Sequence, residues 1–167
     1  MSAARSVSAT IPDAESFAPY GRVHVLDAGE GPGLVLTEGD GWVDAYTRDP
    51  LTREVPSLGM TRAPGMPFAS ARMERHRNVE EALVPAGSPL VLAVAEPTGT
   101  AAPRAENVRA FVIPCGTVVV LDPGVWHDAC RGLDGPTGYF WLASCVDSGS
   151  SPWTAIEGGP VAVRVDS

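Results

Sequence analysis

Apolar residues in this chain gather in short runs that are separated by Gly, Pro, Asp or Asn. Two of these runs, Leu90–Ala95 and Val118–Leu121, are continuously apolar, which is expected of strands buried on both faces. No long segment has a helical period, and no internal repeat is visible. Regularly spaced short strands with turn signals predict a β-sandwich or β-barrel. The predicted strands are Arg22–Leu26, Gly33–Leu36, Trp42–Tyr46, Ser70–His76, Glu81–Val84, Leu90–Ala95, Val108–Ile113, Val118–Leu121, Tyr139–Val146 and Val161–Val165.

Three segments have a less regular pattern. Residues 1–12 are expected to be a loose leader, and residues 14–20 a short helix start or a turn. Residues 48–67 hold four prolines and predict a loop or irregular edge strands. The remaining length, residues 13–167, suits a single domain that buries a sizeable core.

Charge and composition exclude several functions. The chain has 20 acidic and 12 basic residues, a net charge of −8, which disfavours nucleic acid and anionic membranes as partners. The 12 basic residues are all arginine, and the sequence contains no lysine. Both lysine Schiff-base chemistry and a P-loop need a lysine, so both are excluded.

The cysteines and the N-terminus indicate the compartment. Cys115, Cys130 and Cys145 form no CxxC pair, and the first residues lack the apolar core of a secretory signal. No apolar run approaches the length of a membrane span. We therefore expect a cytoplasmic protein with reduced thiols, and buried cysteines rather than a nucleophile.

One of two suggestive histidine segments is residues 72–81. On a strand, Arg72, Glu74 and His76 share one face, and Glu80 and Glu81 follow at the head of the next apolar run. Imidazole and carboxylate groups that converge inside a barrel suit a divalent ion such as Zn, Mn, Ni or Fe. The alternative is a charged surface hairpin.

The other histidine segment follows the apolar run Val118–Leu121. An Asp122-Pro123-Gly124 turn reverses the chain, so His127 begins a new strand near the end of the previous one. The alternative is a plain hairpin with a histidine at its edge. The third histidine, His24, has no comparable surroundings.

Together the two segments resemble the motif pair of the cupins. In the first motif Glu74 stands in place of the first histidine, His76 is the second, and six residues separate Glu80 from Gly87. In the second motif two residues separate Gly124 from His127. The resemblance implies an all-β fold, the cupin-type double-stranded β-helix or jelly-roll barrel. Because cupins are often dimers, it also implies a homodimer.

The closer resemblance is to the ureidoglycolate lyase family of cupins. The matching segments are collinear and cover most of the chain. They are Phe17-Ala18-Pro19-Tyr20-Gly21, Glu74-Arg75-His76, Ala82-Leu83-Val84-Pro85, Arg109-Ala110-Phe111 and Pro123-Gly124-Val125-Trp126-His127.

This resemblance implies cleavage of ureidoglycolate, a small carboxylic acid, into glyoxylate and urea. It implies a divalent metal bound by His76, His127 and either Glu80 or Glu81. Glu74 or Asp122 would act as the base or as an extra ligand, and His127 would take part in catalysis. The substrate would be held by Arg72 or Arg109, whose guanidinium groups can pair with a carboxylate, and by Trp126.

The sequence departs from the family pattern at three positions. Asp122 and Asp128 stand where members usually have histidine, and Glu81 stands where glutamine is common. A more anionic site leaves two alternatives open. One is a lyase, hydrolase or isomerase acting on a different small hydroxy or keto acid, and the other is a non-catalytic cupin that binds a metabolite.

Overall fold

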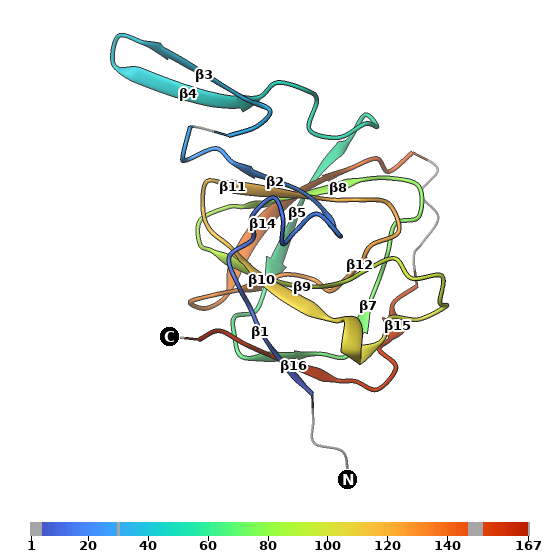
Figure 1. The fold of residues 1–167 in the computed structure, drawn as a ribbon. Coiled ribbons are helices and arrows are strands. Elements are labelled where there is room, and N and C mark those ends of the chain that lie inside the picture. Colours follow the sequence, from blue (N-terminus) through green and yellow to red (C-terminus); the bar gives the residue numbers. More distant parts are fainter. Residues whose placement is uncertain (1–4, 30, 147–151, 167) are drawn as a thin grey trace.

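The computed structural model describes residues 5–29, 31–146 and 152–166, and in these residues the fold is all-β (Figure 1). Strands β1 to β16 are joined by turns, and a single turn of 3₁₀ helix, η1, spans Ala105–Asn107 in the described part. This confirms the predicted fold class. Within the same residues, no helix has the length and apolar character needed to cross a membrane.

Two facing sheets form the body of the protein. The larger has the order β2 (Gly21–Val25), β11 (Thr117–Leu121), β8 (Glu81–Pro85), β14 (Thr137–Ala143), β5 (Ser57–Ala63). The smaller has the order β10 (Arg109–Ile113), β9 (Leu90–Ala95), β12 (Trp126–His127), with β13 (Arg131–Gly132) also paired to β9.

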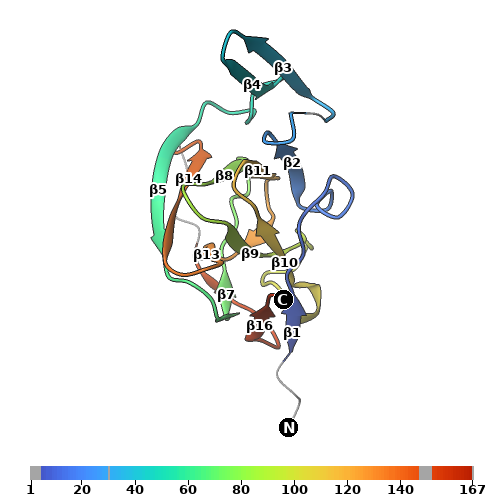
Figure 2. The ribbon, with the colours of Figure 1, turned by 90° about the vertical axis from the view of Figure 1, so that its left-hand side faces the viewer.

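Smaller units complete the fold. A third sheet has the order β1 (Ser6–Ser8), β16 (Val161–Arg164), β6 (Phe68–Ser70). Strand β7 (Arg72–Met73) pairs with β15 (Thr154–Ala155), and β3 (Leu34–Gly39) forms a hairpin with β4 (Trp42–Thr47). Figures 1 and 2, which view the molecule from two perpendicular directions, both show this hairpin extending away from the sheets.

Strand β9 separates two hydrophobic cores. Its residues Leu90, Leu92 and Val94 pack into the core between the two main sheets. The alternate residues Val91, Ala93 and Ala95 pack into a second core with β16 and the end of the chain. Every residue of β9 is buried, because both of its faces are covered. This is the arrangement that the continuous apolar run predicts.

The segment Phe17-Ala18-Pro19-Tyr20-Gly21 is a corner whose two aromatic side chains are buried. The rings of Phe17, Tyr20 and Phe111 pack together with centroids 5.1 to 5.8 Å apart. Gly21 follows with a φ of +146°, and a Cβ there would lie 1.8 Å from the carbonyl oxygen of Val120. Only glycine fits this close approach between β2 and β11.

The predicted strand Ser70–His76 is divided in the structure, where β6 ends at Ser70, β7 spans only Arg72–Met73 and Glu74 forms an isolated bridge. Two further segments were not predicted as regular strands but are strands in the structure. Residues 6–8, expected to be part of a loose leader, form β1 and pair in parallel with β16. Residues 57–63, expected to be loop or irregular edge strand, form the regular edge strand β5, which pairs with β14 over its whole length. In both cases the partner strand lies far along the chain, so local sequence does not reveal the pairing.

Replacing Gly21 by alanine is expected to destabilise the fold by about 1–3 kcal/mol, because the new methyl group must displace the backbone of β11. Urea denaturation followed by circular dichroism measures the change. The matched control is Gly87→Ala, at a site with open space around the added Cβ. Equal stability of the two variants would contradict the packing argument.

Candidate active site

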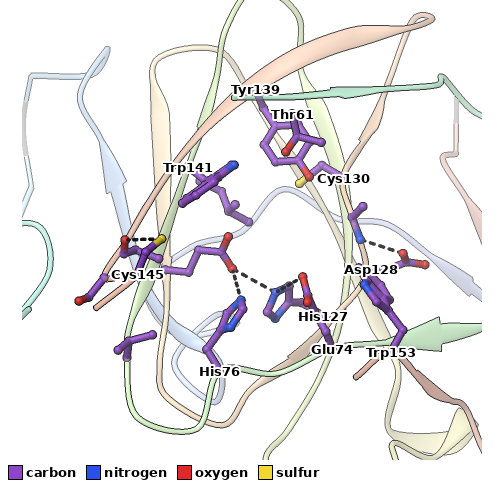
Figure 3. Close-up of a pocket in the computed structure, with 16 residues that line it drawn as sticks. Thr61, Glu74, His76, His127, Asp128, Cys130, Tyr139, Trp141, Cys145 and Trp153 are labelled. Carbon is purple, nitrogen blue, oxygen red and sulfur yellow. Dashed lines mark hydrogen bonds and ion pairs between the residues drawn. The ribbon is translucent and has the colours of Figure 1, made fainter. Parts of the chain in front are cut away.

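A pocket of about 300 Å³ opens between the large sheet and the segments that carry His76 and His127 (Figure 3). Polar groups gather on one side of it, and the opposite side is formed by Thr61 of β5 with Tyr139 and Trp141 of β14. The acidic residues and histidines that line it are Glu74, His76, Glu81, His127 and Asp128.

Backbone hydrogen bonds bring the two histidine segments together. The N–H of Glu74 donates to the carbonyl oxygen of His127 (3.0 Å), and the N–H of His127 donates to that of Glu74 (2.9 Å). The N–H of Gly124 donates to the carbonyl oxygen of His76 (2.7 Å). An isolated antiparallel bridge therefore places residues about fifty positions apart side by side.

The side chains of these segments meet at Glu81, the first residue of β8. Glu81 Oε2 lies 3.0 Å from His127 Nε2 and 3.3 Å from His76 Nε2. Glu74 Oε1 lies 3.8 Å from His127 Nε2, and the two imidazole rings are 5.3 Å apart. Ligand atoms of Glu74, His76 and His127 all lie within 4.8 Å of one another.

The orientation of His127 is fixed by its other nitrogen. Nδ1 lies 3.1 Å from the carbonyl oxygen of Val125, which accepts a hydrogen bond from it, so Nε2 faces the carboxylates of Glu74 and Glu81. Burial alone would lower the pKa of His127, but its contacts with Glu81 and Glu74 outweigh this effect and raise the pKa. Without a bound ion, the imidazole is therefore stabilised in its charged form.

The pKa values of Glu81 and Glu74 are shifted in opposite directions. Burial alone would raise the pKa of Glu81, but its contacts with His127 and His76 lower it to about 2. For Glu74 burial is the larger effect and raises the pKa, and the nearby charge of Glu81 adds to it. The site thus holds one strongly ionised carboxylate and one that retains its proton more readily.

The donor set fits a divalent metal ion. His127 Nε2 and Glu81 Oε2 are buried and lack a hydrogen-bond partner among the described residues, although they face each other. Because metal–ligand bonds to nitrogen and oxygen are about 2.0–2.2 Å long, two donors on one ion lie roughly 3 Å apart. The distances from Glu81 to both imidazoles match that separation. Nitrogen and oxygen donors suit Zn, Mn, Ni or Fe.

Tyr139 and Trp141 are site residues that the sequence analysis did not single out. They alternate on the inward face of β14, and Trp141 covers Gly59 on the paired strand, where a Cβ would lie 2.0 Å from the indole ring. Burial raises the pKa of Tyr139, so its hydroxyl keeps its proton and is a hydrogen-bond donor. In the sequence, Tyr139, Trp141 and Ala143 alternate along one predicted strand and so share one of its faces. The alternation does not show whether that face points into the protein or outward.

Two carboxylates predicted for the site lie elsewhere. Glu80 is fully buried, but its Oε1 lies 2.8 Å from Arg22 and its Oε2 accepts the backbone N–H of Arg53 (2.8 Å). Asp122 is partly exposed at the end of β11, 3.7 Å from the same arginine. Neither lines the pocket, so the structure favours Glu81 over Glu80 as a ligand and gives Asp122 no contact with the site.

Two predicted substrate-binding residues also lie away from the pocket. Arg109 is exposed, and its guanidinium donates to the backbone carbonyls of Glu106 and Val108. Trp126 precedes His127 on β12, so it points to the opposite face, where it is buried in the second core beneath the guanidinium of Arg75. Its role in this structure is packing.

Arg72 lies in a groove that adjoins the pocket. This groove, of about 280 Å³, shares Asp128, Ala129 and Trp153 with the pocket and is also lined by Arg131. The Arg131 guanidinium donates to the carbonyls of Ala129 (3.0 Å) and Cys130 (3.3 Å). These bonds hold a cation at the border of the pocket, and the sequence analysis did not identify it.

Asp128 lines both the pocket and the groove. Strand alternation predicts that it points away from the site, but β12 ends at His127 and the chain turns there. The carboxylate accepts hydrogen bonds from the Ser70 hydroxyl (2.8 Å) and the Ala129 N–H (2.8 Å). Two of the three positions that depart from the family pattern, Glu81 and Asp128, therefore lie in the pocket.

Comparison with known proteins identifies the family. The sequence model of a family described as ureidoglycolate lyase matches residues 43–152. The chain is 33% identical over 125 residues to a ureidoglycolate lyase of Azotobacter vinelandii, which covers 71% of this chain and 72% of that protein. It is 31% identical over 119 residues to a ureidoglycolate lyase of Pseudomonas savastanoi pv. phaseolicola, which covers 68% of each chain. The matched segments include the pocket residues from Thr61 to Cys145. The chain therefore belongs to the ureidoglycolate lyase family.

Proposed function

We propose that this protein is a lyase that cleaves ureidoglycolate into glyoxylate and urea. The observation that carries the proposal is the convergence of Glu74, His76, Glu81 and His127 in one pocket, in a chain that matches the family over that pocket. Its volume of about 300 Å³ suits a small molecule of this size.

The reaction is the breakdown of a hemiaminal and needs one proton acceptor and one proton donor. The hydroxyl group of ureidoglycolate loses its proton, and its C–O bond becomes the carbonyl of glyoxylate. The electron pair of the broken C–N bond goes to the urea nitrogen, which takes up a proton. No oxidant or further reactant is needed, because atoms and charge balance between substrate and products.

His76, His127 and Glu81 are our proposed metal ligands, because Glu81 Oε2 is within 3.3 Å of both imidazole nitrogens. A bound divalent ion would orient the substrate and favour loss of its hydroxyl proton. Glu74 is then the proposed base, since its carboxylate is more exposed to the pocket than that of Glu81 and lies beside the same imidazole. His127 serves as a ligand and is not required to carry a proton.

Tyr139 is the proposed donor on the opposite wall. Its hydroxyl is held beside Thr61 and Cys130 (Figure 3), and burial keeps it protonated. From there it can donate to the ureido group and stabilise the departing urea nitrogen.

The substrate carboxylate needs a cationic partner, because Glu74, Glu81 and Asp128 already make the pocket anionic. The described residues that line the pocket include no arginine, whereas the adjoining groove has Arg72 and Arg131. We therefore assign the carboxylate to the border between pocket and groove, where a guanidinium can form paired hydrogen bonds with it.

A second candidate function is favoured by Glu81 and Asp128. Both place a carboxylate in the pocket where the family resemblance implies a neutral or basic side chain. Such a site would also suit a lyase, hydrolase or isomerase that acts on another small hydroxy or keto acid. The cytoplasmic location and the homodimer expected from the sequence remain predictions.

Urea release from ureidoglycolate by the purified, metal-loaded protein tests the proposed function. We expect turnover by the wild type, measured against the spontaneous rate. If the anionic pocket has changed the substrate, Asp128→His is expected to increase turnover, whereas Asp122→His, at the exposed end of β11, leaves it unchanged. No turnover by any of the three, with activity on another acid in a panel, would establish the second candidate.

Two isosteric substitutions separate the roles of the carboxylates. Glu81→Gln is expected to lower metal affinity by about ten- to a hundredfold or more, because it removes a charged ligand. Glu74→Gln is expected to keep the metal and to lower kcat about 10²–10⁴-fold, as loss of a proton acceptor does. Metal content by mass spectrometry, metal titration by calorimetry and single-turnover kinetics give the readouts. The reverse pattern would exchange the two roles.

Arg72→Gln and Arg131→Gln test the assigned carboxylate position. Both are expected to raise KM roughly tenfold or more with a smaller effect on kcat, because they weaken binding of a charged group that does not itself gain or lose a bond in the reaction. Activity on the neutral amide of the substrate should change little. Arg109→Gln, which alters an exposed arginine outside the pocket, is the matched control. Equal effects on acid and amide would contradict the assignment.

A further inference from the structure

Glu80 is a charged side chain that is buried outside the pocket. None of its side-chain surface is exposed, and it does not line the pocket. Its Oε1 lies 2.8 Å from Arg22 Nη1 and 3.5 Å from Arg53 Nε, and its Oε2 accepts the backbone N–H of Arg53 (2.8 Å). Taking charges out of water is costly even when they are paired, so a buried ion pair contributes little net stability. What such a pair does supply is a defined geometry.

The contacts of Glu80 join segments that are far apart in the sequence. Arg22 belongs to β2, and its Nη2 donates to the carbonyl oxygen of Leu51 (3.1 Å). The N–H of Glu80 itself donates to Glu54 Oε2 (3.3 Å). Both the backbone and the carboxylate of Glu80 are therefore held, by β2 and by residues 51–54.

Glu80 ends the loop that connects two of the proposed metal ligands. His76 and Glu81 are separated by residues 77–80, which pair with no strand in the described structure. Of these four residues only Glu80 is buried. The pairing of β8 with β11 and β14 starts at Glu81. The contacts of Glu80 therefore fix the point at which the chain enters β8.

The direction of the Glu81 side chain follows from that entry. Adjacent residues of an extended chain point to opposite faces, so holding Glu80 toward Arg22 directs Glu81 into the pocket. There its Oε2 lies 3.3 Å from His76 Nε2 and 3.0 Å from His127 Nε2. A rotation of the backbone at this point would change both distances. Hydrogen bonds resist such a rotation because they are directional, whereas apolar contacts are not.

We propose that Glu80, held by Arg22, is a positioning residue that keeps the Glu81 carboxylate aligned with the imidazoles of His76 and His127. It acts through the backbone at the start of β8. The inference rests on the proposed function in one respect, the assignment of Glu81 as a metal ligand. Loss of the ion pair should therefore weaken metal binding although every ligand is still present, as loss of the outer partners of metal ligands does.

Zn²⁺ titration of the full chain by calorimetry tests this role. Glu80→Gln is expected to lower Zn²⁺ affinity about ten- to a hundredfold, because the amide can still accept the Arg53 N–H but loses the ion pair with Arg22. Arg53→Gln is the matched control. It removes a side chain that is 74% exposed and keeps the backbone N–H that donates to Glu80, so it should bind Zn²⁺ as the wild type does.

A double variant, Arg22→Met with Glu80→Met, separates positioning from stability. Replacing a buried ion pair by apolar residues of similar size often leaves stability unchanged, whereas removing one partner does not. The double variant should therefore unfold in urea near the wild-type midpoint and still bind Zn²⁺ about tenfold or more weakly. Zn²⁺ affinity that recovers together with stability would overturn the positioning role, because the pair would then only support the fold.

A cycle with Glu81→Gln shows whether Glu80 acts through its neighbour. If it does, Glu80→Gln should change Zn²⁺ affinity little in a protein that already carries Glu81→Gln. Equal effects in both backgrounds would overturn the inference. Zn²⁺ binding by the wild type without urea release would overturn the proposed function, while the affinities of the variants would still decide the role of Glu80. A wild type that binds no Zn²⁺ would overturn the ligand set and this inference together.

Discussion

The antiparallel bridge between Glu74 and His127 is the contact on which the candidate site depends. Its two backbone hydrogen bonds, at 3.0 and 2.9 Å, fix the relative register of segments about fifty residues apart. His76 is tied to the same turn through Gly124, so both imidazoles face the first residue of β8. Because these bonds join backbone groups, they do not depend on which side chains, such as Glu81 and Asp128, line the pocket.

Strand alternation explains most of what the sequence could predict. The all-β class and the double burial of β9 follow from apolar runs and turns, which are local features. The approach of His76 and His127 was expected only from the resemblance to the cupin motif pair. Local sequence did not show which of Glu80 and Glu81 faces the pocket. Adjacent residues at the start of β8 point to opposite sides, and Glu80 is drawn outward by Arg22, whose position 58 residues earlier gives no sign of the pairing.

The parts that sequence reasoning missed depend on where alternation stops and on which face is inward. Asp128 lines the pocket because β12 ends at His127 and strand alternation stops there. Asp122 follows the end of β11 and lies near Arg22, outside the pocket. Tyr139 and Trp141 lie on a strand that was predicted, but only the pairing of β14 with β5 and β8 shows which side faces the pocket. Arg131 is placed by backbone carbonyls that precede it, a contact no motif describes.

Electrostatics then limits the chemistry that the pocket can support. Glu74, Glu81 and Asp128 surround two imidazoles in a space that admits an anionic substrate only if positive charge offsets them. His127 and His76 lower the pKa of Glu81, so its side chain is stabilised as a carboxylate. The Asp128 side chain accepts hydrogen bonds from the Ser70 hydroxyl and the Ala129 N–H. Positive charge is available from the imidazole of His127, whose pKa is raised by Glu81 and Glu74, and from Arg72 and Arg131 of the adjoining groove. These cationic groups lie on the side of the pocket away from the wall that carries Tyr139 and Trp141, so the two sides differ in charge and in hydrogen-bonding character.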